Sequence, residues 1–588
     1  MLRRWRLDDL FPGLDSAEYL EATNQVEDQM RDFETLRDRL GPGLTHDMFT
    51  EALTRYEKLV RLLSRLLNYG FLLIAQDMGS ERAQGCWAQV QQIAAQAENR
   101  TLFFNTWWKS INEETAEGFA HAAPEFRYWL KSLRQQIPFS LSEAEEKIIN
   151  IKDSTGSEAL LKLYELISGR YEFKLEIKGE VQTFKRYDLN DFIRSSIPEV
   201  RTAAYREYLG ALEEDKTILG QIYIHRVQDW HRENVLLRGY ASPIGVRNLH
   251  HDLADEVVEI LLEVCRKNTP LFQRYFSLKA RALGLERLRR CDLYAPVMAS
   301  KITYTFEQAV DLVLESFHQF DARFADLARR ILNESHLDSE VRVGKRPGAF
   351  CAVVEPGLTP WVSLTYEGKL EDLIRLGREL GRGIHALMAA HHNVFTQKAP
   401  RILSESASAF CELVILGHLI ATTHEPDFRR TLLFKQMDNA YTAIQRQAYF
   451  SLFERRVHDC IQEGVTVGEL CDIYLDNLAE QFSGSLELSE NFRYEWLGIS
   501  SFYHLPFSTY ASAFGRLLVL SIYNRYQLEG EQFKKRYLKI LEAGGSDSPA
   551  NILKHAGIEI ASPDFWQSGF DVVAEALEEL DAMQRQLQ

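Results

Sequence analysis

The chain lacks the features that mark secreted, nucleic-acid-binding or membrane-spanning proteins. Its 588 residues include seven cysteines and no Cys-x-x-Cys pair, which predicts reduced thiols rather than a disulfide framework. The formal net charge of −16 is offset by no basic tract, which argues against nucleic acid as a partner. No stretch approaches the length of a transmembrane helix, and the basic start is followed by no apolar run. We therefore expect a cytoplasmic protein with no membrane association.

What the chain has is helical periodicity with two interruptions. A hydrophobic fraction of 45% and a charged fraction of 26% are ordinary for a soluble protein. Tyr56–Ala75 shows apolar residues at three- and four-residue spacing, as an amphipathic helix requires. Glu172–Tyr187 alternates, turns near Lys178 and alternates again, which predicts a β-hairpin, and 341–368 predicts a pair of short strands. With no repeat and no low-complexity linker, the expectation is a mostly α protein with small β elements.

The stretch Gly377–His392 has the frame of a zinc-peptidase helix without its histidines. In a His-Glu-x-x-His helix the two histidines lie one turn apart and bind the metal, and the glutamate activates a bound water. Here Arg378 and Arg382 occupy the histidine positions, while Glu379 keeps the position of the general base. A guanidinium stays protonated and has no lone pair for Zn²⁺. The sequence therefore predicts that the protein holds no zinc here.

An ordinary amphipathic helix with a solvated arginine face would also fit this stretch. Its apolar residues fall on one stripe, and Arg378, Arg382 and His385 fall opposite. However, the three glycines Gly377, Gly381 and Gly383 cost about 1 kcal/mol each against alanine inside a helix. We interpret them as a sign that another element packs closely against this helix.

Four segments in order along the chain are Asp292-Leu-Tyr-Ala-Pro, Gly344-Lys-Arg-Pro-Gly-Ala-Phe-Cys, the helix segment Leu376–His385, and Ala556-Gly-Ile-Glu-Ile with Pro563-Asp-Phe-Trp-Gln-Ser. With these segments the chain resembles oligoendopeptidase F, of the thimet-oligopeptidase family of zinc metallopeptidases, over roughly 127–581. The resemblance implies a two-lobed helical ellipsoid with a deep central channel and a zincin-type core. It also implies an N-terminal helical region over 1–120, an oligoendopeptidase F N-terminal-type region with the hairpin over 121–200, and a peptidase-like domain over 201–588.

The resemblance also implies where the zinc ligands would stand. Relatives use two histidines of the motif helix and one glutamate of the next helix, in a Glu-x-x-Ser context. The matching glutamate is Glu405, so Arg378, Arg382 and Glu405 are the former metal-ligand positions and Glu379 is a vestigial general base. Without a metal, Glu379, Glu405 and the nearby Glu412 would repel one another. Glu405 could be an ordinary exposed carboxylate of a helix, but we expect it to be buried and paired with at least one of the two arginines.

A late segment of the family binds the scissile carbonyl and its oxyanion. In this chain Ser501 takes the usual histidine position, Ser508 replaces a tyrosine, and Tyr510 persists. Tyr503 and His504 either substitute for the missing groups or simply pack. Together with these residues, the substrate channel is expected to include a strand that binds extended peptides, and one further histidine: Gly348, Ala349, Phe350 and His385.

Three functions compete. The first is a pseudopeptidase without zinc or another cofactor, which binds peptides in its channel or partners an active peptidase paralogue or a second copy of itself. The second is an active metalloendopeptidase of oligopeptides that uses Glu379 with a non-standard metal site. The third is a structural subunit with a collapsed channel.

Overall fold

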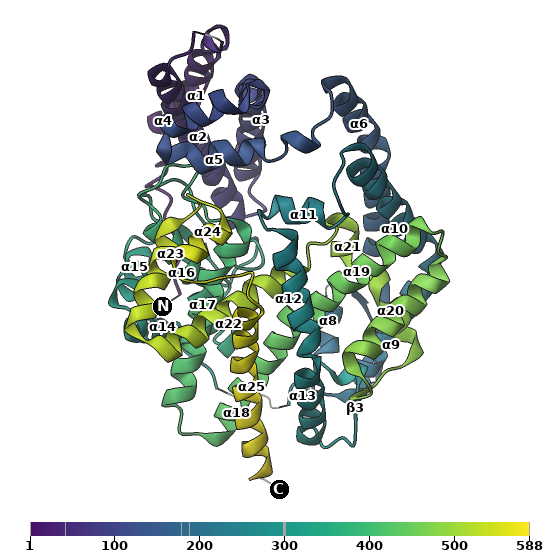
Figure 1. Cartoon of the computed structure of the whole chain (residues 1–588). Helices are drawn as coiled ribbons and strands as arrows, with labels where there is room; N and C mark the ends of the chain where they lie inside the picture. The colour runs from purple at the N-terminus through teal and green to yellow at the C-terminus, as the bar shows by residue number, and fades with distance from the viewer. Residues whose placement is uncertain (1, 42, 178, 187, 298–301, 587–588) are drawn as a thin grey trace. The chain divides into compact units, whose positions relative to one another are not determined.

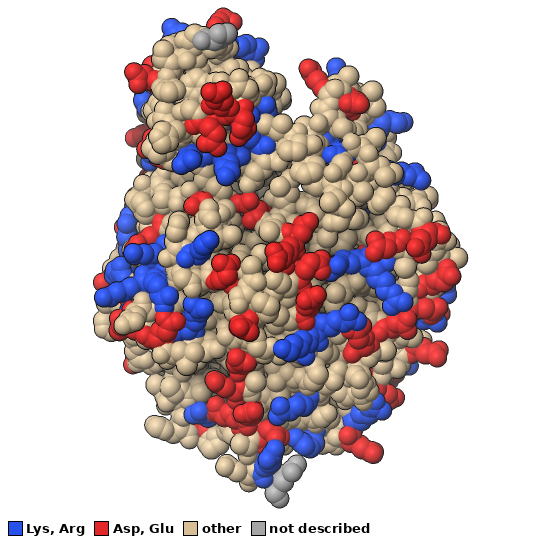
Figure 2. Space-filling view, viewed as in Figure 1, with Lys and Arg blue, Asp and Glu red and all other residues tan. Residues whose placement is uncertain are grey.

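The computed structural model describes residues 2–41, 43–177, 179–186, 188–297 and 302–586, and it is mostly α-helical (Figure 1). This confirms the expected fold class. The chain divides into two compact units. Unit 1 comprises Met1–Ile137, Ile302–Thr422 and Tyr526–Ile558, and unit 2 comprises Pro138–Lys301, Thr423–Arg525 and Glu559–Gln588. Acidic and basic side chains are interspersed on the face that Figure 2 shows.

Unit 1 is built of helices around one small sheet. Its elements are α1 (Ala17–Glu34), η1 (Arg37–Arg39), α2 (His46–Gln76), α3 (Glu81–Ser110), α4 (Glu113–Ala122), η2 (Pro124–Phe126), α5 (Arg127–Arg134), α14 (Phe306–Phe320), α15 (Ala322–Asn333), β4 (Leu337–Asp338), β5 (Phe350–Ala352), β6 (Trp361–Ser363), α16 (Leu370–Met388), α17 (Arg401–Thr422), α23 (Glu531–Ala543) and α24 (Pro549–His555). Helix α2 contains the whole periodic stretch Tyr56–Ala75, as predicted.

Unit 2 is helical as well, with two two-stranded pairings. Its elements are α6 (Glu143–Thr155), α7 (Ser157–Gly169), β1 (Glu172–Ile177), β2 (Glu180–Lys185), α8 (Leu189–Ile193), α9 (Pro198–Glu214), α10 (Lys216–Trp230), the π-helical η4 (His231–Leu237), α11 (Gly245–His250), α12 (Asp255–Lys267), α13 (Thr269–Ala282), β3 (Leu288–Arg289), η5 (Arg290–Asp292), α18 (Pro426–Ala440), the π-helical η6 (Tyr441–Gln445), α19 (Arg446–Gln462), α20 (Val467–Phe482), β7 (Leu486–Glu487), η7 (Glu490–Gly498), α21 (Ser500–His504) and α25 (Pro563–Arg585). Two elements, η3 (Ile137–Phe139) and α22 (Tyr510–Glu529), contain residues of both units.

The predicted hairpin is confirmed in unit 2. Strands β1 and β2 pair antiparallel, with Phe173 opposite Phe184 and Leu175 opposite Gln182. Phe173 and Leu175 are buried and their neighbours in β1 are exposed, so the alternation in the sequence is the alternation of the two faces. The expected turn residue Lys178 and the end residue Tyr187 lie outside the described residues.

The predicted pair of short strands belongs to the sheet of unit 1. The strand order is β4-β6-β5, with β6 parallel to β4 and antiparallel to β5. Cys351 of β5 lies opposite Val362 of β6, and β6 is wholly buried. Strand β5 is therefore at an edge of the sheet, and the chain runs from β6 directly into α16.

Helix α17 corrects one expectation. Its segment Ile402–Thr422 is long and apolar enough to cross a membrane by length and composition, which the sequence analysis overlooked. In the structure, 78% of its apolar window is buried inside the protein. A core helix that is surrounded by protein needs no polar face, which accounts for this composition.

The cysteines agree with the expectation of reduced thiols, and a cluster of aromatic rings packs the core of unit 1. All seven cysteines are free, and five of them are buried. In unit 1 a cluster of large rings joins α1, α2, α3 and α4, with Phe49 stacked on Trp108 at 5.4 Å between ring centroids. Such aromatic packing stabilises this unit beyond the burial of its apolar area.

Candidate functional site

Helix α16 places the candidate residues by packing closely against α17. Its apolar stripe, which includes Leu376, Leu380 and Ile384, is fully buried. A Cβ atom on Gly381 would lie 2.7 Å from Sγ of Cys411 and 3.0 Å from the carbonyl oxygen of Ala407, both in α17. The interpretation of the glycines as close-packing positions is thus confirmed, since a side chain would force the two helices apart.

Where the two helices face each other, arginines and carboxylates form one connected group, which we call the arginine cluster: Arg378, Glu379, Arg382, Glu405 and Glu412. Nη1 of Arg378 donates to Oε2 of Glu412 at 3.0 Å, and its Nη2 lies 3.9 Å from Oε2 of Glu405. Nη2 of Arg382 donates to the same Glu405 oxygen at 2.8 Å, and its Nη1 donates to Oε1 of Glu379. Two guanidinium groups thus bridge three carboxylates on two helices.

The burial of these carboxylates differs from the expectation in one respect. Pairing of an arginine with Glu405 is confirmed, but Glu405 is 51% exposed, so its expected burial is wrong. It lies near the start of α17 beside an open cavity, where its side chain meets solvent. The buried carboxylates are Glu379 and Glu412, at 5% and 2% exposure. The arginines therefore compensate two buried carboxylates, Glu379 and Glu412, in addition to their contact with the half-exposed Glu405.

The electrostatics of Arg382 follow from these contacts. Burial by itself would lower the pKa of Arg382, but the charge of Glu379, its hydrogen bond and then those of Glu405 outweigh burial and raise the pKa above its ordinary value. A guanidinium this firmly protonated is a permanent cation. Oε2 of Glu379 has no hydrogen-bond partner among the described residues, so the group depends on Arg382 for most of its compensation.

A cavity of about 370 Å³ opens beside the arginine cluster within unit 1. Arg382, Glu405 and His385 line it, together with Cys351 of β5 and Gln397. Burial lowers the pKa of His385 to about 4, so this imidazole is neutral at physiological pH. Its Nε2 is buried without a partner in the described structure, which makes it a free polar atom beside the cavity wall. His385 therefore lines a cavity beside the arginine cluster, and its role in a substrate channel stays a prediction.

The expected peptide strand lies at the sheet edge, and its side chains at Ala349, Phe350 and Cys351 are half-buried. Phe350 packs its ring on Phe71, with 5.1 Å between centroids, and on Trp5. Gly348 has a φ of +91°, a conformation that L side chains rarely adopt, and Ala349 links it to β5. Of the described strands only β6 pairs with β5, so the second edge of β5 has no strand on it.

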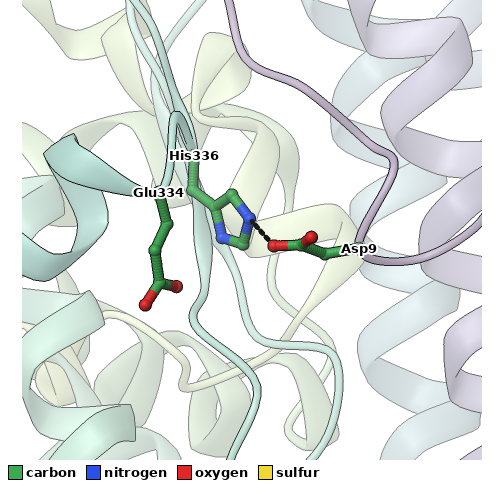
Figure 3. Close-up of side chains that lie close together, drawn as sticks. All are labelled: Asp9, Glu334 and His336. Carbon is green, nitrogen blue, oxygen red and sulfur yellow. Dashed lines mark hydrogen bonds and ion pairs between the residues drawn. The ribbon is translucent and has the colours of Figure 1, made fainter.

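Two other groups of three side chains could hold a cation, among the residues that the structure describes. One is Asp9, Glu334 and His336 in unit 1, whose donor atoms lie within 4.8 Å of one another (Figure 3). Nδ1 of His336 bonds the carbonyl oxygen of Thr359 at 2.9 Å, and its Nε2 lies 3.0 Å from Asp9. The other group, in unit 2, is acidic: Asp153, Asp229 and Glu233. Neither group contains a residue of the arginine cluster.

Comparisons with known proteins identify the fold and the family. The family model described as peptidase family M3 matches residues 192–572, about two thirds of the chain. The chain belongs to peptidase family M3. A second model, described as oligopeptidase F, matches residues 107–173 of this M3 chain.

Individual relatives of the M3 chain agree. Oligopeptidase PepF of Bacillus subtilis is 24% identical over 592 aligned residues, covering 98% of this chain and 87% of the relative. A crystal structure from Chlamydophila abortus is similar over 99% of this chain and 100% of its own, with 20% identity and a TM-score of 0.88. The crystal structure of oligoendopeptidase-F from Enterococcus faecium is similar over 96% of this chain and 98% of its own, with 18% identity and a TM-score of 0.71. These likenesses extend the M3 fold over the whole chain.

The late segment that resembles the oxyanion-binding region of the M3 family lies in unit 2. Tyr503 is fully buried and stacks on Tyr164 at 3.8 Å between ring centroids, so it packs in the core. Nε2 of His504 bonds Glu165 at 3.0 Å on the surface of the unit. The hydroxyl of Tyr510 is buried and lies 2.9 Å from Nδ1 of His251. Each of these groups thus has a local partner.

The two serines of this segment differ in their surroundings. Ser501 lies in α21 and lines a cavity of about 970 Å³ within unit 2, whereas Ser508 lies in the turn before α22. The larger cavity is a feature that the sequence analysis missed. Its walls come from β2, α8, α9, α19 and η7, and no local motif marks residues that meet from so many separate segments.

Proposed function

We propose that this M3-family chain is a pseudopeptidase that binds peptides without hydrolysing them. The observation that supports the proposal is the arginine cluster, in which Arg378 and Arg382 pair with Glu379, Glu405 and Glu412. By the resemblance, these two arginines take the positions of the zinc-binding histidines. Their two positive charges equal the charge of one Zn²⁺ ion. The two arginines therefore offset two of the three negative charges, as a Zn²⁺ ion would.

A zinc ion does not fit these residues. Neither guanidinium has a lone pair to give, so Glu405 would be the only remaining ligand of the three positions. At a separation of 4 Å and an effective dielectric constant of 20, two unit charges repel by about 4 kcal/mol, and a divalent ion would be repelled by each arginine about twice as strongly. The carboxylate of Glu379, held by Arg382, has no metal-bound water to activate in this arrangement.

The peptide-binding half of the proposal is supported by the open edge of β5. An extended peptide can add to a sheet edge through main-chain hydrogen bonds, which require no metal and tolerate many sequences. Cys351, in the middle of β5, also lines the cavity beside the arginine cluster, so side chains of a bound peptide would have a space to enter. A partnership with an active peptidase or with a second copy of the chain is compatible with the same surface.

One set of measurements tests this function. The wild-type protein, purified without chelator, is analysed for zinc and incubated with internally quenched oligopeptides, and its binding of the same peptides is followed by fluorescence anisotropy. We expect well under one zinc per chain, no cleavage and saturable binding. Cleavage that is abolished in Glu379→Gln would establish an active hydrolase instead, and absence of both cleavage and binding would favour a structural subunit.

A further inference from the structure

The 970 Å³ cavity of unit 2 is lined by an excess of positive charge. Four of its lining side chains are cationic and one is a carboxylate; they are Lys185, Arg186, Arg194, Arg446 and Glu495. Its volume is at the upper end of the range of small-molecule sites. We call this cavity the cationic pocket.

The one carboxylate of the cationic pocket is already engaged. Glu495 is 6% exposed, and it accepts from Nη2 of the buried Arg290 at 2.7 Å and from the hydroxyl of Tyr474 at 3.0 Å. Nη2 of Arg446 reaches it only at 3.4 Å. Since Arg290 already balances the charge of Glu495, Arg446 adds a positive charge that no further lining carboxylate compensates.

The other two arginines of the pocket have no carboxylate partner among the described residues. Arg194 lies over the ring of Tyr294, 5.3 Å from its centroid. Arg186 donates from Nη2 to the carbonyl oxygen of Gly498 and lies 6.0 Å from the ring centroid of Tyr208. Lys185 differs, because it pairs with the exposed Glu172 at 2.6 Å. Three guanidinium groups thus share one pocket without a counter-charge of their own.

Unpaired hydrogen-bond donors also indicate that the pocket wall lacks acceptors. In the described structure, Nε of Arg446 and the hydroxyl of Tyr294 are buried and have no partner. Buried polar atoms are nearly always hydrogen-bonded, so an unpaired donor in a pocket wall indicates that an acceptor belongs there. A face of fully solvated arginines would not bury these atoms. Guanidinium forks match carboxylate and phosphate oxygens best.

We propose that the cationic pocket binds a small anionic ligand through carboxylate or phosphate groups held by Arg186, Arg194 and Arg446, with Tyr294 as a further donor. The rings of Tyr205 and Tyr208 in the wall suit an attached planar or apolar part of the ligand. The proposal does not depend on the absence of zinc or of peptidase activity in unit 1.

The test uses the full chain and two probes, pyrophosphate and a triglutamate peptide, titrated calorimetrically at low salt. We expect at least one probe to bind, and its affinity to fall as salt is added. Arg194→Gln should weaken that binding at least about tenfold, because a charge-assisted hydrogen bond is lost. This variant suits the test because Arg194 contacts the ring of Tyr294 and pairs with no carboxylate among the described residues, so the substitution breaks no ion pair of the fold.

A matched control and a second variant complete the design. Arg274→Gln removes the same charge from an exposed position of α13 in the same unit and should leave the affinity unchanged. Arg186→Gln should weaken binding in the way that Arg194→Gln does. Binding of pyrophosphate alone would indicate a phosphate ligand, and binding of triglutamate alone an acidic peptide or polycarboxylate. Failure of both probes to bind, or wild-type affinity in Arg194→Gln, would overturn the proposal.

Discussion

Replacing Arg382 by alanine is the most direct perturbation of the arginine cluster. The substitution removes the hydrogen bond to Oε1 of Glu379, whose side chain is only 5% exposed and whose Oε2 is unpartnered in the described structure. It also removes the 2.8 Å contact to Glu405. The first loss leaves a charge buried without compensation, and the second leaves a half-exposed carboxylate that water can solvate.

The two losses differ in size. Deleting one partner of a buried ion pair costs about 3–5 kcal/mol, and the lower end applies because Arg382 itself is 26% exposed. The pair with Glu405 resembles a surface salt bridge, which is worth about 0–1 kcal/mol. We therefore expect Arg382→Ala to lower the free energy of unfolding by about 3 kcal/mol, most of it through Glu379.

Chemical denaturation followed by circular dichroism measures this difference. The matched control is Arg329→Ala in α15, which breaks an ion pair to Asp326 between two exposed side chains and should change stability by no more than about 0.5 kcal/mol. Adding Glu379→Gln to Arg382→Ala removes the stranded charge and should restore about 1–2 kcal/mol. If Arg382→Ala denatures as Arg329→Ala does, the cluster is surface charge and the reasoning is refuted.

Three further predictions concern packing, pH and metal. Gly381→Ala should destabilise the protein by about 1–3 kcal/mol through overpacking against α17, whereas Gly85→Ala in α3, with open space around it, should stabilise it by about 0.5–1 kcal/mol; thermal melts of both variants decide. Burial raises the pKa of Glu454 from 4.5 to about 8, so the stability that its protonated form contributes is lost progressively as the pH rises from about 5 to about 8. Over that range the free energy of unfolding of Glu454→Gln should rise relative to wild type by about 1.4 kcal/mol per pH unit, and denaturation curves whose difference does not change with pH would contradict this. The double variant Arg378→His with Arg382→His should be less stable than wild type without zinc and regain about 2.7 kcal/mol at a zinc concentration of 100 times its Kd; melts that ignore zinc would show that the ligand geometry is gone.

The sequence predicted the parts of this protein that depend on local spacing. Helix α2, the β1–β2 hairpin and the strand pair before α16 follow from periodicities of 3.6 and 2, which are properties of neighbouring residues. The link between Arg382 and Glu405 was predictable because the resemblance places Glu405 on the helix that faces both arginines, and a carboxylate there pairs with a guanidinium. The glycines of α16 indicated that another helix packs closely against it, because glycine destabilises a helix interior unless close packing requires it.

What the sequence did not predict depends on how distant segments meet. Glu405 and Glu412 lie on one helix in similar contexts, and only the packing around α17 leaves the first half-exposed and buries the second. From the sequence, Tyr503 could have faced a channel or the core. It lies in the core, stacked on Tyr164, which is more than three hundred residues away in sequence. The cationic pocket is a stronger case, because Arg186, Arg194 and Arg446 belong to no common sequence motif. Only the fold brings them to one cavity.

The arginine cluster has a consequence for how this protein is assembled and maintained. Arg378 and Arg382 are covalently part of the helix they fasten, so the contact between α16 and α17 forms in a single unimolecular event. A junction made only of side chains needs no metal-loading step after synthesis. If the chain binds no metal at this site, as we propose, protein made under metal starvation or handled in strong chelator should keep the junction unchanged.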